Sequence, residues 1–272
     1  MNLSTRTYYY KPIKKPSDKA LIDRIEQICL DFPRYGYRRV TQQLKREGWL
    51  VNHKKVHRIM GEKGWLCRPR KRKWVCTTDS NHKLPIYPNL IKDLTTERIN
   101  QLWVADITYI HILVCFIYLA VILDVYSRKA IGYAISRRID TQLTLAALRM
   151  AIVNRNPPPK CIHHSDRGMQ YASSEYVKEL EFHKFQISMS RKGNPDDNAY
   201  AESFMKTLKS EEVHLWEYRT MADVKRRIPY FIEDVYNQKR LHSAIGYRPP
   251  CEFEMMLDQT PNPGQSTLIT PL

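Results

Sequence analysis

The chain has 272 residues, of which 43% are hydrophobic, and it carries a formal net charge of +16. This length fits one large domain or two smaller ones, and the hydrophobic fraction is typical of a soluble globular protein. No stretch approaches the roughly 18 consecutive apolar residues of a membrane span, and the first residues contain no apolar signal segment. The six cysteines form no C-x-x-C pair, which favours reduced thiols and a cytosolic protein.

The positive charge is concentrated in the first third of the chain. Residues 1–98 contain 23 Lys and Arg against 9 Asp and Glu, a net charge of +14. Residues 99–272 contain the remaining 21 against 19, a net charge of +2. A basic segment joined to a nearly neutral body favours a nucleic-acid-binding module fused to a second domain. A solvated basic surface that aids solubility is the alternative.

Three short helices are predicted in this basic region from the spacing of apolar residues, over residues 18–32, 38–47 and 53–63. Gly48 and Gly64 end the second and third helices, and Asn52 caps the third. Two short helices joined by a tight turn are typical of a helix-turn-helix, although three small helices also pack together without DNA. The candidate DNA-binding residues are Arg38, Arg39, Lys54, Lys55 and Arg58.

Beyond a basic linker, the pattern changes to that of an α/β domain. The predicted strands are 102–113, 116–126, 130–136, 160–164 and 186–189, and the predicted helices are 141–154, 174–182, 198–214 and 222–236. Three antiparallel strands, a helix, and then alternating short strands and helices predict a ribonuclease H-like core, a mixed five-stranded sheet flanked by helices. The predicted division is a helix-turn-helix domain (1–66), a linker (67–98), a catalytic core (99–215), and a C-terminal helical extension and tail (216–272).

Three acidic residues stand where structure alone would not select them. Asp106 interrupts a strand, Asp166 follows a short apolar strand, and Glu202 lies near the start of a helix. Between the first two lie 59 residues, and between the last two lie 35. Each acid taken alone is more simply a turn, cap or surface residue, whereas the set of three with its flanking residues favours a common site.

Carboxylates in such a set suit hard divalent cations, because Mg²⁺ prefers oxygen ligands. Two such ions can clamp the attacking and leaving oxygens of an in-line phosphoryl displacement. We therefore expect two Mg²⁺ or Mn²⁺ ions held by Asp106, Asp166 and Glu202.

Five segments carry a resemblance to a known family. They are Tyr-Gly-Tyr-Arg-Arg-Val at 35–40, Trp-Val-Ala-Asp-Ile-Thr-Tyr at 103–109, the 164–171 segment with His-Ser-Asp-Arg-Gly and Gln-Tyr, the 198–211 segment, and a tail motif over 236–249. Together they resemble the OrfB part of an insertion-sequence transposase, in the DDE superfamily that includes retroviral integrases. The resemblance covers nearly the whole chain, from residue 35 to residue 253.

The resemblance implies metal-dependent DNA cleavage and joining at transposon ends, with water or a DNA 3′-hydroxyl as nucleophile. Asp106 and Asp166 would bind most of the metal and Glu202 would complete the second site. Lys209, two helical turns after Glu202, would contact DNA phosphate, with a solvated helix lysine as the alternative. The implied partners are double-stranded DNA (terminal inverted repeats and target), further copies of the chain, and an upstream OrfA product. The implied location is the bacterial cytoplasm, at the nucleoid.

Two other interpretations bear on the same residues. His53, His57, Cys67 and Cys76 suggest a zinc site, but eight residues separate the cysteines where zinc pairs usually have two to four. A catalytically inactive, transposase-derived regulator that binds DNA is the alternative function. The presence of all three acids favours the enzyme.

Residues beside the acids have structural interpretations. His163 and His164 are expected to pack or to support the site, because neighbouring strand residues point to opposite faces and do not form a hydrolase triad. Asp124, at the end of the second strand, is expected to order the turn that follows.

Overall fold

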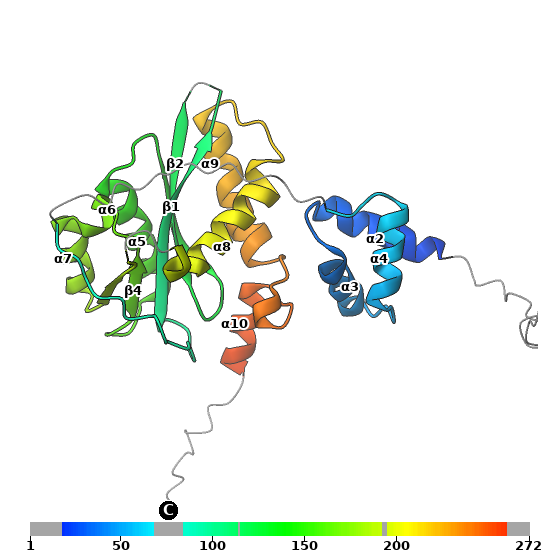
Figure 1. The fold of residues 1–272 in the computed structure, drawn as a ribbon, viewed down its shortest axis with the longest axis horizontal. Helices are drawn as coiled ribbons and strands as arrows, with labels where there is room; N and C mark the ends of the chain where they lie inside the picture. Colours follow the sequence, from blue (N-terminus) through cyan, green and yellow to red (C-terminus); the bar gives the residue numbers. More distant parts are fainter. Residues whose placement is uncertain (1–17, 68–83, 114, 192–194, 260–272) are drawn as a thin grey trace, which may run out of the picture. The chain divides into compact units, whose positions relative to one another are not determined.

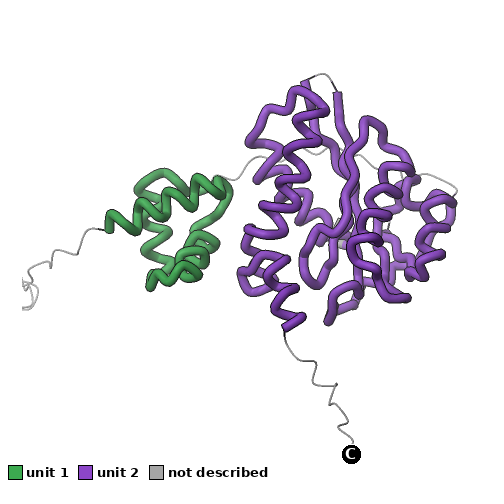
Figure 2. Tube along the Cα trace, turned by 180° about the vertical axis from the view of Figure 1, so that it is seen from behind, with its two compact units in different colours: residues 1–70 green, residues 71–272 purple. Residues whose placement is uncertain are grey.

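The computed structural model describes residues 18–67, 84–113, 115–191 and 195–259. The chain divides into two compact units, residues 1–70 and 71–272 (Figure 2). Half of the predicted linker, residues 68–83 with the basic run 68–73 and Cys76 of the zinc hypothesis, lies outside the described residues. Within the described ranges, no helix combines the length and the apolar character needed to cross a membrane.

The first unit is a three-helix domain that follows the predicted order. Its helices are α2 (Lys19–Asp31), α3 (Tyr37–Arg46) and α4 (His53–Glu62). The predicted cap is confirmed, because the Asn52 side chain accepts a hydrogen bond from the amide of Lys54 at 2.9 Å. Gly48 and Gly64 follow α3 and α4 with φ of 87° and 72°, a conformation that glycine adopts without strain. The predicted helix-turn-helix arrangement of α3 and α4 is therefore present.

The second unit contains one five-stranded sheet with the order β3-β2-β1-β4-β5. The strands are β1 (Leu102–His111), β2 (Phe116–Asp124), β3 (Ala130–Ser136), β4 (Ile162–Ser165) and β5 (Gln186–Met189). Strands β1, β2 and β3 pair antiparallel, whereas β4 is parallel to both β1 and β5. The predicted mixed sheet is confirmed.

Helices cover both faces of this sheet (Figure 1). One face carries α5 (Thr141–Arg155), α6 (Met169–Ala172) and α7 (Ser174–Phe182). The other carries α8 (Ala199–Leu208) and α9 (Met221–Tyr230). Alternation along β1 assigns its side chains to these faces, since Leu102 and Val104 pack on the α8 side and Trp103 and Ala105 on the α5 side. Both faces of the central strand are therefore buried.

Helix α5 lies directly against β3 at Gly132. A Cβ atom added to Gly132 would lie 2.4 Å from the carbonyl oxygen of Ala147 and 2.7 Å from Cβ of Ala151. No larger side chain fits between strand and helix, so this close approach requires glycine.

The last third of the chain departs from the regular helices predicted for it. Helix α8 continues as a π-helix, η2 (Lys209–Val213), and α9 continues as a second, η3 (Phe231–Asn237). Pro229 lies inside α9 and has no amide hydrogen to donate, and π-helical turns accommodate such an interruption. A short 3₁₀ turn, η4 (Ser243–Ile245), and α10 (Pro250–Gln259) complete the unit.

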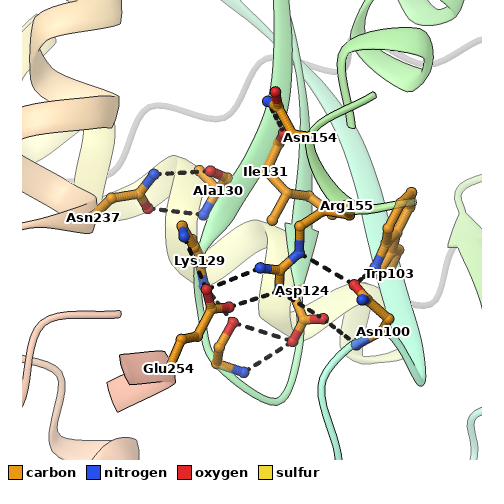
Figure 3. A network of polar contacts seen from close by, with 11 residues as sticks. Asn100, Trp103, Asp124, Lys129, Ala130, Ile131, Asn154, Arg155, Asn237 and Glu254 are labelled. Atoms are coloured by element: carbon orange, nitrogen blue, oxygen red, sulfur yellow. Dashed lines mark hydrogen bonds and ion pairs between the residues drawn. The ribbon is translucent and has the colours of Figure 1, made fainter. Parts of the chain in front are cut away.

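A buried polar network joins α10 to the end of β2 (Figure 3). Arg155 pairs with both carboxylate oxygens of Glu254, at 2.6 and 2.9 Å, and Lys129 contacts the same carboxylate at 2.9 Å. Asp124 accepts hydrogen bonds from the amides of Ser127 at 2.9 Å and Asn100 at 2.6 Å. The expectation that Asp124 orders the following turn is confirmed, and its burial raises its pKa.

Candidate active site

The register of two parallel strands brings Asp106 and Asp166 to the same level. In the ladder between β1 and β4, Leu102 pairs with Ile162 and Val104 pairs with His164. Continuing this register by two residues places position 106 opposite position 166. Strand β4 ends at Ser165, so both aspartates lie where the parallel ladder ends. Functional groups of open α/β sheets commonly gather at this edge.

Asp106 lies on the face of β1 that α8 covers. Side chains of alternate residues in a strand lie on the same face, so Asp106 lies on the face on which Leu102 and Val104 pack. Helix α8 brings Glu202, in its first turn, to the same side. Burial and the negative charges of Asp166 and Glu202 together raise the pKa of Asp106 to about 7, against a hydrogen bond from the Ile107 amide. Asp166 and Glu202 therefore both lie within electrostatic range of Asp106.

The turn after β4 holds the carboxylate of Asp166. The amide of Gly168 donates to Asp166 Oδ1 at 2.9 Å. A Cβ on Gly168 would lie 3.0 Å from Asp166 Oδ1 and 3.0 Å from Oε1 of Gln170. The absence of a side chain at residue 168 thus leaves room for this carboxylate, a role that sequence reasoning missed.

Lys209 supplies positive charge next to Asp106. Its ammonium lies 4.6 Å from the centre of the Tyr109 ring, and Tyr109 stands three residues after Asp106 on β1. Burial lowers the pKa of Lys209, and the charge of Asp106 opposes that change. The structure brings this predicted residue to the carboxylates, and it also identifies Tyr109 as the ring that supports it.

Two buried ion pairs fix the π-helical turn that begins with Lys209. Glu211 pairs with Arg240 through both oxygens, each at 2.7 Å. The next residue, Glu212, pairs with Arg227 at 2.6 and 3.0 Å. Arg240 belongs to the tail motif of the sequence, so that motif contributes to the structure beside the carboxylates.

The two histidines before Asp166 are neutral and buried. His163 contacts the hydroxyl of Tyr176 at 2.9 Å, and burial lowers its pKa to about 3. His164 contacts the hydroxyls of Ser188 at 2.8 Å and Ser190 at 3.0 Å. Burial lowers the pKa of His164 to about 4. Both side chains pack in the core, as expected.

No group of three His, Cys, Asp or Glu side chains in the described ranges converges closely enough to ligate a single ion. Asp166 and Glu202 each lie near enough to Asp106 to raise its pKa, and Glu202 is on the exposed side of α8. Three carboxylates in this arrangement suit ions that each bind two protein ligands. Water and phosphate oxygens would complete the coordination shell of each ion.

Three of the five candidate DNA-binding residues of the first unit lie together on α4. Lys54, Lys55 and Arg58 line an open hollow of about 320 Å³ together with Asp18. Lys55 pairs with Asp18 at 2.7 Å, and Arg58 pairs with Glu62 at 2.9 Å. These pairs are solvent-accessible and contribute little stability.

Arg38 and Arg39 lie at the start of α3 rather than in this hollow. Arg38 stacks over Tyr37 and Arg39 over Tyr35, each at 5.7 Å from the ring centre. The rings of His53 and His57 pack against Tyr37 at 6.3 and 4.7 Å. These two histidines thus have a packing role between α3 and α4.

Comparison with known proteins gives matches over both units. Family profiles described as an integrase core domain match residues 96–195 and 183–250, and an HTH-like domain profile matches residues 16–73. The chain is 38% identical over 259 residues to the "Insertion element IS600 uncharacterized 31 kDa protein" of Shigella sonnei, covering 92% of this chain and 94% of that protein. It is 38% identical over 247 residues to the "Transposase for insertion sequence element IS904" of Lactococcus lactis, covering 90% and 97%. A chain of the simian T-cell lymphotropic virus intasome in complex with PP2A regulatory subunit B56 gamma aligns with a TM-score of 0.48 at 15% identity, covering 92% of this chain and 77% of that one.

Proposed function

This chain belongs to the insertion-sequence transposases of the DDE and integrase superfamily, and we propose that it cleaves and joins DNA strands at insertion-sequence ends with Asp106, Asp166 and Glu202 as its active site. The observation that carries the proposal is the β1–β4 register, which brings two acids 60 positions apart to one level at the end of a parallel ladder. Structural stability does not explain this placement, because neighbouring carboxylates repel each other.

The carboxylates fit divalent metal ions. Asp106 is half-buried, its pKa is raised to about 7 by burial and by two further acids, and Lys209 supplies the opposing charge. Hard oxygen donors in this arrangement suit Mg²⁺ or Mn²⁺, and we propose two ions per site. When bound, such ions would activate the attacking oxygen and stabilise the leaving oxygen of the phosphodiester.

The protein's own residues would bind and orient the DNA strand. Asp106 and Asp166 would hold the reacting phosphate in place through the ions, and Glu202 would complete the site from α8. Lys209 would contact a neighbouring phosphate oxygen, because its ammonium lies beside Asp106 and is held by Tyr109. Water is the nucleophile for cleavage, and a DNA 3′-hydroxyl is the nucleophile for joining.

The first unit would provide DNA affinity. Lys54, Lys55 and Arg58 share one surface of α4, and Arg38 and Arg39 lie on the preceding helix. We propose that these residues bind the terminal inverted repeats, with α4 entering the major groove. Deleting residues 1–66 is expected to remove most sequence-specific binding, measured by footprinting, and an unchanged footprint would refute this division of labour.

Transposition also implies partners. Two DNA ends and one target must meet in one complex, so we propose that the chain acts as a homo-oligomer when the ends are paired. An upstream OrfA product, fused or separate, is proposed as a further partner.

The test is strand transfer on DNA that carries terminal inverted repeats, with Mg²⁺. Asp106→Asn, Asp166→Asn and Glu202→Gln are each expected to abolish cleavage and joining while DNA binding persists. Asp124→Asn is a control, because Asp124 is also a buried acid but lies in the network with Arg155. Near-normal joining by any of the three variants would refute the site. Inactivity of the parent chain with intact DNA binding would favour the alternative, a transposase-derived regulator.

A further inference from the structure

The start of α8 is attached to β1 by one buried side chain. Asn198 is only 6% exposed, and its Nδ2 donates to the carbonyl oxygen of Ala105 at 3.1 Å. Ala105 immediately precedes Asp106, and Asn198 stands four residues before Glu202, one helical turn away. The contact therefore lies between two of the proposed active-site acids.

The carbonyl that Asn198 uses belongs to the edge of β1 that faces β4. Main-chain groups of alternate residues in a strand point toward the same neighbour, and the Gln101 carbonyl accepts from the amide of Ile162 at 3.0 Å. The Ala105 carbonyl points the same way but lies beyond Val104, where the ladder with β4 ends. The Asn198 amide thus bonds to β1 at the position where the two strands separate, next to both aspartates.

A second contact ties the same segment to β4. The main chain of Asp197 lies close enough to the ring of His164 to raise the pKa of that histidine, and His164 stands two residues before Asp166. Residues 197 and 198 therefore lie against both β1, which carries Asp106, and β4, which ends one residue before Asp166.

Asn198 is a poor choice for stability alone. Its Oδ1 is buried and has no hydrogen-bond partner among the described residues. A buried unpaired acceptor costs roughly 1–3 kcal/mol. By contrast Asn237, also 6% exposed, pairs both amide atoms with the backbone of Ala130 at 3.0 and 2.9 Å (Figure 3).

We propose that Asn198 is a positioning residue that sets the placement of Glu202 relative to Asp106 and thereby the affinity of the site for divalent cations. The inference rests on the proposed function, because it requires the three acids to bind metal. Residues that orient metal ligands typically change metal affinity by about 10- to 100-fold when they are replaced.

The test compares truncation of Asn198 with truncation of Asn237 in the full chain without DNA. Asn198→Ala is expected to raise the Kd for Mn²⁺, measured by calorimetry, by about 10- to 100-fold. The urea denaturation midpoint of Asn198→Ala is expected to fall less than that of Asn237→Ala, because Asn237→Ala breaks two hydrogen bonds. Asn237→Ala should leave the Mn²⁺ affinity unchanged. Asn198→Leu fills the same volume without the hydrogen bond and is expected to match Asn198→Ala in Mn²⁺ affinity.

A double-mutant cycle tests whether the effect runs through Glu202. In a Glu202→Gln background, Asn198→Ala is expected to change the Kd for Mn²⁺ by less than about twofold, because the ligand that it positions has been lost. The inference would be overturned if Asn198→Ala bound Mn²⁺ as tightly as the parent chain does. It would also be overturned if Asn198→Ala weakened Mn²⁺ binding equally with and without Glu202. Either result would leave the proposed function standing. A parent chain that binds no Mn²⁺ would refute the proposed metal site and this inference with it.

Discussion

The raised pKa of Asp106 predicts how the stability of the metal-free protein depends on pH. The pKa rises from 3.8 to about 7 because the carboxylate is buried beside two other acids. Since one pH unit of pKa corresponds to about 1.36 kcal/mol, ionised Asp106 costs roughly 4 kcal/mol of folding free energy above pH 7. The folded state binds the Asp106 proton more tightly, so the stabilisation from protonation is fully present below pH 3.8 and is lost as pH rises to about 7, where the cost of ionisation is complete.

Asp106→Asn removes this penalty and retains Oδ1, which accepts from the Ile107 amide at 2.8 Å. In EDTA, the variant is expected to be more stable than the parent by an amount that grows from pH 3.8 to about pH 7 and then levels off. Urea denaturation at several pH values measures the difference. Mg²⁺ at about 100 times its Kd should stabilise the parent by roughly 2.7 kcal/mol and the variant much less. Parallel pH profiles, or equal stabilisation of both by Mg²⁺, would refute the reasoning.

Gly168→Ala is expected to displace the carboxylate of Asp166, because the added Cβ would lie 3.0 Å from Oδ1; calorimetry should show a Kd for Mn²⁺ raised by about 10-fold, and an unchanged value would contradict the contact. Lys209→Met keeps the aliphatic stem and should slow single-turnover strand transfer by about 100-fold. Lys206 is an exposed lysine on α8, and Lys206→Met should leave the rate of strand transfer unchanged. Equal effects of the two substitutions would show that only surface charge matters. Glu211→Ala removes the carboxylate that pairs with the buried guanidinium of Arg240 and should cost about 3–5 kcal/mol in urea denaturation, whereas a loss below about 1 kcal/mol would show that solvent screens the pair.

The sheet and most helices could be predicted because their signals are local. Alternating apolar residues predicted the boundaries of strands β1, β2 and β3 to within about two residues. Asn52 and Gly64 indicated the two ends of α4. The π-helical turns carry no such signal. The ion pair beside η2 joins Glu211 to Arg240, 29 residues away, so the turn depends on contacts that a local pattern does not contain.

The same limit applies to the site. Asp106 and Asp166 could be selected because an acid within or directly after an apolar strand is costly unless it has a partner or a task. Their roles stay a prediction until strand transfer is measured. Asn198 received no role from the sequence, because its partner Ala105 lies 93 residues away and an asparagine before a helix is ordinarily a cap. In the structure it makes no side-chain cap to α8.

The network around Glu254 predicts how nonsense mutations near the end of the gene affect the protein. A stop codon after Pro249 would remove only the last 23 of 272 residues, in a segment beyond all three acids. It would nevertheless delete the carboxylate that pairs with Arg155 and Lys129. The Arg155 side chain is only 12% exposed, and it would keep Asp124 as a carboxylate partner and the amide oxygen of Asn100 as an acceptor. Losing one partner of a buried pair typically costs about 3–5 kcal/mol, a large part of the stability of most domains. Late nonsense mutations are therefore expected to inactivate a copy through unfolding, even with every active-site codon intact.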